Sequence, residues 1–223
     1  MVTVALDIDP DQARPWVDEA QPTHPSLIDR SHHTNQALGF TNVPMAVWID
    51  ESGTLVRPAE GASIEARDTT GPLPDGLPDR VVELIGEARK IPDIGLAYRA
   101  AVLDWVTNGA ASPYALAPEE VVAASQPRGA DQSLAAANFE MGWHQYSLAG
   151  KDAAAPYWRE AHRLDPQNWT FKRQAWTLET TAPGQPSDLF QPPTEAYEGN
   201  WLDDVRALGG GENYIVVPSF LAE

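Results

Sequence analysis

The sequence predicts an α/β module followed by an all-α module. Short β-branched runs alternate with helical segments over the first 67 residues, and residues 68–79 are rich in Pro, Gly and Asp. Beyond that stretch the apolar period changes from two residues to 3.6. We therefore expect an α/β module at 1–67, a linker at 68–79, and a helical module with an irregular C-terminal tail at 80–223.

Composition limits the classes of partner. The chain has 223 residues, of which 43% are hydrophobic, and its 15 basic and 32 acidic residues give a formal charge of −17. Such a surface repels nucleic-acid phosphates and anionic lipid, so we expect neither partner. No apolar run approaches the roughly 20 residues that span a bilayer, and the first residues, MVTVALDIDPDQ, do not resemble a signal peptide. A cytoplasmic location is the expectation.

The sequence contains no cysteine. This excludes disulfides, thiolate metal ligands and cysteine nucleophiles within this chain. The chain therefore cannot carry out thiol–disulfide chemistry by itself.

The first module begins with a strand and a helix. The run at 2–7, VTVALD, is typical of a buried strand. Asp9 followed by Pro10 predicts the start of a helix that covers 11–20. We expect this helix to bury one apolar face, which consists of Ala13, Trp16 and Val17.

Two further elements precede the most informative stretch. Residues 26–29, SLID, indicate a second short strand. Residues 31–38 are typical of one or two helical turns, and Gly39 is a suitable residue to end them.

A hairpin is predicted next. Residues 45–49 form a continuous apolar strand that starts directly after Pro44, where a proline removes no ladder hydrogen bond. Ser52 and Gly53 form a tight turn, and 54–57 pair back.

The second module is predicted to be helical. Its expected helices cover 80–89, 94–106, 118–125, 131–149, 152–164, 168–179 and 201–208. Residues 180–198 indicate Pro-rich coil, and 214–217 indicate a strand-like or extended segment near the C-terminus.

The order of elements in the first module resembles the second half of a thioredoxin-like domain, most closely the TlpA/ResA type of thiol–disulfide oxidoreductase and related redoxin families. The segments VTVALD, PSLID and LGFTNVPMAVWIDESGTLV carry this resemblance, over about a quarter of the chain. The resemblance implies that Pro44 follows a cis peptide bond and that the backbone of Val43 pairs with an extended peptide.

The resemblance also implies a missing part. In the family, a strand and the Cys-x-x-Cys helix precede the segment that here begins at Val2, so we expect the central strand of the sheet to be absent. Three explanations are open. The chain is a fragment, a partner or second copy supplies the strand, or the remaining strands pair directly.

Residues 135–168 resemble one tetratricopeptide repeat. The residues that fall on the packing positions of this repeat are Met141, Gly142, Ala154, Trp158, Ala161 and Pro166. A plain helical bundle is the alternative interpretation of this region.

Two other groups of polar residues lie close together in the sequence. His32 and His33 with Asp29 could suggest a metal ion, but adjacent histidines cannot easily face one ion, and we expect exposed loop histidines. Asp50 and Glu51 lie at a turn, which argues against acid–base catalysis. No cofactor and no metal are expected. Four tryptophans are expected in the core rather than in a peptide groove, namely Trp143, Trp158, Trp169 and Trp176.

The sequence thus favours a cysteine-free protein that acts in protein or peptide binding and assembly, without redox catalysis in this chain. Its expected partner is a protein or peptide, such as a second copy or a chain that completes the sheet. The alternative is a fragment or subunit of a redoxin-family oxidoreductase whose catalytic cysteines lie upstream or on a partner.

Overall fold

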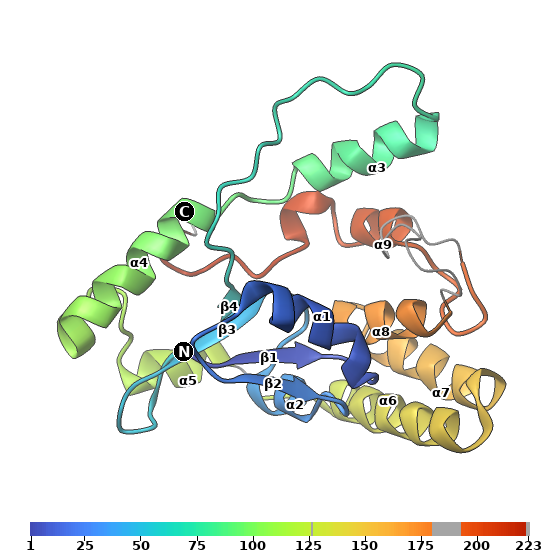
Figure 1. Cartoon of the computed structure of the whole chain (residues 1–223), viewed down its shortest axis with the longest axis horizontal. Coiled ribbons are helices and arrows are strands. Elements are labelled where there is room, and N and C mark those ends of the chain that lie inside the picture. The colour runs from blue at the N-terminus through green and yellow to red at the C-terminus, as the bar shows by residue number, and fades with distance from the viewer. Residues whose placement is uncertain (126, 180–192, 222–223) are drawn as a thin grey trace. The chain divides into compact units, whose positions relative to one another are not determined.

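A computed structural model describes residues 1–125, 127–179 and 193–221 (Figure 1). This part of the chain contains helices and two small two-stranded sheets, so the prediction of a mixed α and β chain is confirmed at that level. The chain forms two compact units. Described residues of 1–41, 128–179 and 193–198 belong to unit 1, and the other described residues belong to unit 2.

Unit 1 begins with a parallel strand pair. β1 (Thr3–Leu6) pairs with β2 (Ser26–Asp29) in a register that sets Thr3 beside Ser26, and the two strands lie side by side in Figure 1. Helix α1 (Pro10–Ala20) connects them, because parallel strands need a crossover. The Asp9 side chain accepts a hydrogen bond from the Asp11 N–H at 3.0 Å, as its predicted role as N-cap requires.

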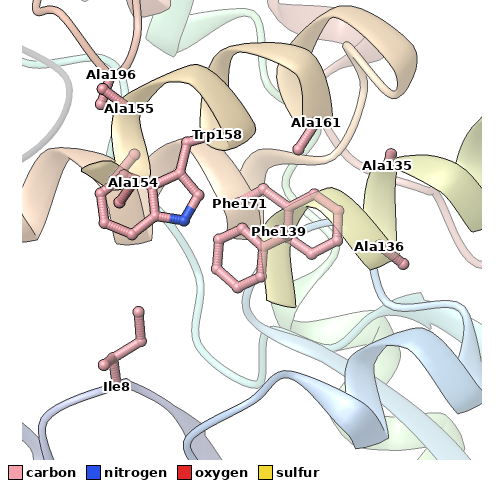
Figure 2. Packing of buried hydrophobic residues seen from close by; sticks show 11 residues of the cluster. Ile8, Ala135, Ala136, Phe139, Ala154, Ala155, Trp158, Ala161, Phe171 and Ala196 are labelled. Carbon is pink, nitrogen blue, oxygen red and sulfur yellow. The ribbon is translucent and has the colours of Figure 1, made fainter. Parts of the chain in front are cut away.

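Three further helices form the core of unit 1. They are α6 (Ala130–Ala149), α7 (Lys151–Leu164) and α8 (Trp169–Glu179). Figure 2 shows their shared core, in which Trp158 lies close to Phe139 and Phe171, and these two phenylalanine rings stack at 4.3 Å. Ile8, directly after β1, enters the same core, and its N–H donates to the Gln174 side chain at 3.0 Å. The end of β1 is therefore held against α8.

A short helix, α2 (His33–Leu38), also belongs to unit 1. It ends at Gly39, whose φ of 80° is left-handed, as the sequence predicts.

Unit 2 contains the predicted hairpin. β3 (Met45–Ile49) pairs with β4 (Leu55–Gly61) in the antiparallel sense, and the Asp50 carboxylate accepts N–H bonds from Ser52 and Thr54 in the turn. β4 continues beyond the predicted end at residue 57. Pro58 lies where the register shifts by one residue, and such a bulge accommodates a residue without an N–H.

Helices follow this hairpin in the sequence of unit 2. They are α3 (Asp79–Arg89), α4 (Gly95–Asn108), α5 (Pro118–Ser125) and α9 (Trp201–Ala207), with short 3₁₀ turns at Gly109–Ala111 and Gly211–Asn213. The core forms around Trp48, whose indole N–H donates to the Tyr98 hydroxyl at 2.7 Å and whose ring stacks on Trp105.

Three expectations need correction. Residues 214–217 form no strand, although the Gly61 N–H donates to the Val216 carbonyl at 2.8 Å. Trp16 is 73% exposed instead of buried, because no described element covers that part of α1. The first strand, expected to be buried, leaves Val4 exposed. Of the three explanations left open for the missing strand, direct pairing of the strand at 2–7 with that at 45–49 is absent from the described part, where β1 pairs with β2 and β3 with β4.

Helix ends agree with the predicted ones to within two residues, since caps and prolines mark them locally. Most of the predicted coil, residues 180–192, lies outside the described residues. The division of the chain at 68–79 stays a prediction. None of the described helices combines the length and the apolar character that crossing a bilayer requires.

Candidate functional site

An open apolar groove lies along β1, α1 and the start of β2. We call it the β1 groove; it has a volume of about 540 Å³. Its walls include the whole of Thr3–Leu6 and the α1 residues Ala13, Trp16 and Val17. Leu27 of β2 also lines it and is 55% exposed, and Val4 is exposed as well. Several large apolar side chains thus meet solvent at one place.

The backbone beside this groove has a free side. β1 uses one edge to pair with β2, and no strand in the described part of the chain pairs with the other edge. Unpaired N–H and C=O groups of an edge strand are a template for another extended segment. The groove therefore offers both apolar surface and backbone hydrogen-bonding groups.

A carboxylate marks the end of the groove. Asp7 follows β1 directly and lines the cavity. One of its oxygens accepts the N–H of Asp9 at 3.0 Å. Burial raises the pKa of Asp7 above its usual range, and the negative charge of Asp9 acts in the same direction. A cation placed beside Asp7 would offset part of the free-energy cost of burying its negative charge.

The sequence assigned peptide binding to Val43 and Pro44. The peptide bond between them is cis, as the family resemblance implies. The Val43 N–H already donates to the side chain of Asn42 at 2.8 Å, and the Pro44 carbonyl accepts the N–H of Ala62 at 3.2 Å. The role of Val43 and Pro44 in peptide binding stays a prediction.

The tetratricopeptide-like positions bring α6 and α7 together. A Cβ atom on Gly142 would lie 2.5 Å from the Trp158 indole, so only glycine allows this approach. Ala154, Trp158 and Ala161 are fully buried between helices. Met141 and Pro166 are exposed, which places them outside this contact. The small residues at these positions therefore serve the packing of α6 against α7. A role of these helices in binding stays a prediction.

His32 corrects the expectation of exposed loop histidines. It precedes α2 and is buried, with its ring edge-on to Phe139 at 4.7 Å and to Phe171 at 6.3 Å. Its neighbour His33 is exposed, 3.4 Å from the Glu140 carboxylate. Periodicity could not separate the two histidines, since their burial depends on helices more than 100 residues away in the sequence.

Burial of His32 predicts acid sensitivity. Burial lowers the pKa of its imidazole from 6.5 to about 4. The unfolded state therefore binds a proton first, and the free energy of unfolding falls as the pH drops from about 6.5 to about 4, by roughly 3 kcal/mol from this group. Above pH 6.5 the contribution is complete.

Urea denaturation at pH 7 and pH 4.5 measures this effect. We expect His32→Asn, whose side chain stays neutral and tolerates the left-handed backbone at this position, to lose much less stability on acidification than the unmodified chain. His33→Asn is the matched control and should keep the full acid response. Equal responses of the two variants would contradict the assignment.

A buried ion pair in unit 2 was not predicted from the sequence. Arg57 and Glu60 of β4 are almost fully buried, and their side chains form two hydrogen bonds of 2.6 and 2.9 Å. Charged residues usually indicate surface, so no pattern marked this pair. The predicted core tryptophans behave as expected, with Trp158, Trp169 and Trp176 buried and Trp143 partly buried.

Three further observations bear on chemistry and identity. In the described ranges, no three His, Asp or Glu side chains are grouped so that they could hold a metal ion. Asp50 lies at the turn tip, where hydrogen bonds from Ser52 and Thr54 lower its pKa. Comparisons with protein families, curated proteins and solved structures gave no match.

Proposed function

We propose that this chain is a protein-binding or assembly protein that accepts an extended segment of a partner along β1. The observation that carries this proposal is the free edge of β1 beside the open β1 groove. Strand addition uses main-chain hydrogen bonds for affinity and side-chain pockets for selectivity. The groove supplies the apolar contacts through Val4, Trp16 and Leu27.

The wider assignment is part of the same proposal. We regard the chain as a cysteine-free combination of a partial thioredoxin-like module and tetratricopeptide-like helices, located in the cytoplasm. The strand–helix–strand order of β1, α1 and β2 and the close approach of Gly142 to Trp158 support it. The partner would supply the strand that the thioredoxin-like pattern contains and this chain lacks.

Leu27→Asp tests the groove. We expect this change to weaken binding of a fluorescein-labelled peptide of alternating Val and Thr by about tenfold or more, because it places a charge in the apolar wall. Fluorescence anisotropy measures the dissociation constant. A peptide with N-methylated amides should also bind poorly, since it cannot donate to the β1 edge.

Leu103→Asp provides the matched control. Leu103 lies on α4 in unit 2 and is 58% exposed, close to the 55% of Leu27, so both changes alter the surface similarly. Circular dichroism confirms that both variants fold. Equal loss of binding in the two variants, or tight binding of the N-methylated peptide, would contradict strand addition at β1.

The redoxin-subunit alternative makes a different claim. It requires catalytic cysteines from an upstream segment or a partner, because this chain contains none. Incubating the purified chain with insulin and dithiothreitol distinguishes the two. Turnover of insulin disulfides above the rate with dithiothreitol alone would overturn the binding-protein proposal.

A further inference from the structure

The sequence around the β1 groove is strongly acidic. Residues 1–29 contain six carboxylates and one arginine. The carboxylates are Asp7, Asp9, Asp11, Asp18, Glu19 and Asp29, and the arginine is Arg14. Arg14 lies 3.7 Å from Asp11 and is therefore partly neutralised. The rest of the chain adds to the negative field, since the formal charge is −17.

Asp7 is the charge that a partner would meet inside the groove. It lines the cavity at the carboxyl end of β1, whereas Asp18 does not line it. In residues 1–125, 127–179 and 193–221, no lysine or arginine forms an ion pair with Asp7. A half-buried carboxylate without a cation favours a ligand that brings one.

The remaining walls select an apolar strand. Successive side chains of a strand point to opposite faces, so a segment paired with β1 would turn every second residue toward Trp16 and Leu27. The free edge of β1 limits the occupant to extended backbone. A second copy fits poorly, because its own residues 1–29 carry the same excess of carboxylates.

We infer that the β1 groove takes an extended segment of a partner protein in which apolar residues alternate with polar ones and a Lys or Arg lies next to Asp7. This rests on the proposed function and adds to it the chemistry of the partner. A basic segment is attracted by the acidic surface during encounter, and its cation then pairs with the half-buried carboxylate.

Two matched peptides test the inference. One is Lys-Val-Thr-Val-Thr-Val-Lys with blocked ends, and the other has norleucine in place of both lysines. Lysine at both ends places a cation near Asp7 whichever direction the strand takes. We expect the lysine peptide to bind about fivefold more tightly at low salt. This advantage should shrink as salt is raised.

Asp7→Asn identifies the responsible carboxylate. The amide oxygen can still accept the Asp9 N–H, so the local turn is kept while the charge is removed. We expect this variant to bind the two peptides almost equally, and Asp18→Asn to retain the preference for lysine. Thermal unfolding monitors the fold of both variants.

The outcomes separate the two proposals. Equal binding of both peptides by the unmodified chain would overturn the inference and leave strand addition standing. Binding of neither peptide would overturn the proposed function itself. Sedimentation equilibrium showing a dimer that Leu27→Asp dissociates would also overturn the inference, since a second copy would then occupy the groove.

Discussion

Replacing Arg57 by alanine should lower the free energy of unfolding by about 3–5 kcal/mol. Arg57 is 1% exposed, and its guanidinium donates to both oxygens of Glu60. It also donates to the Tyr114 carbonyl and the Ser219 hydroxyl, both at 2.7 Å, and lies 4.8 Å from the centre of the Phe220 ring. The change leaves the Glu60 charge buried without a counterion, which is the main cost.

Urea denaturation measures this loss, and two controls define its cause. Arg14→Ala removes an exposed arginine from its pair with Asp11, and should change stability by less than about 1 kcal/mol. The double change Arg57→Met with Glu60→Leu should cost less than Arg57→Ala alone, because no charge is then left buried. A double variant that is less stable than Arg57→Ala would contradict this explanation.

Trp158→Ala should destabilise the chain by about 3–5 kcal/mol through a cavity in the core of unit 1. Trp158 is fully buried, and its indole contacts the backbone of α6 at Gly142. The Tyr146 ring centre lies 5.7 Å from that of the indole. The space cannot close easily, because α6 already approaches the indole closely at Gly142.

The same substitution elsewhere provides the comparison. Trp16 is 73% exposed, so Trp16→Ala should change stability by about 0.5 kcal/mol or less. Chemical denaturation of the two variants gives the difference directly. Similar losses for Trp16→Ala and Trp158→Ala would show that the α6–α7 contact does not dominate this core.

Local signals predicted the elements well. Asp9 and Pro118 mark helix starts and Gly39 marks a helix end, because capping depends on groups within a few residues. β4 runs past its predicted end at residue 57, because a bulge accommodates Pro58 within the strand.

Contacts between residues far apart in the sequence could not be predicted from such local signals. Trp16 has the apolar spacing of a core residue, and only the absence of a covering element among the described residues leaves it exposed. His32 is buried by Phe139 and Phe171, which lie far along the chain. The β1 groove could not be predicted for the same reason, since the edge that a strand leaves free depends on which segments reach it.

Unit 1 is built from segments that lie far apart in the sequence, which affects its folding during synthesis. The segment 1–41 shares its core with helices that begin after residue 128, so roughly 90 residues must leave the ribosome in between, about 4–18 s at ordinary elongation rates. During that interval Ile8 and His32 lack the aromatic rings that bury them. The nascent chain therefore exposes its first strands before their packing partners exist, and a chaperone has time to bind them.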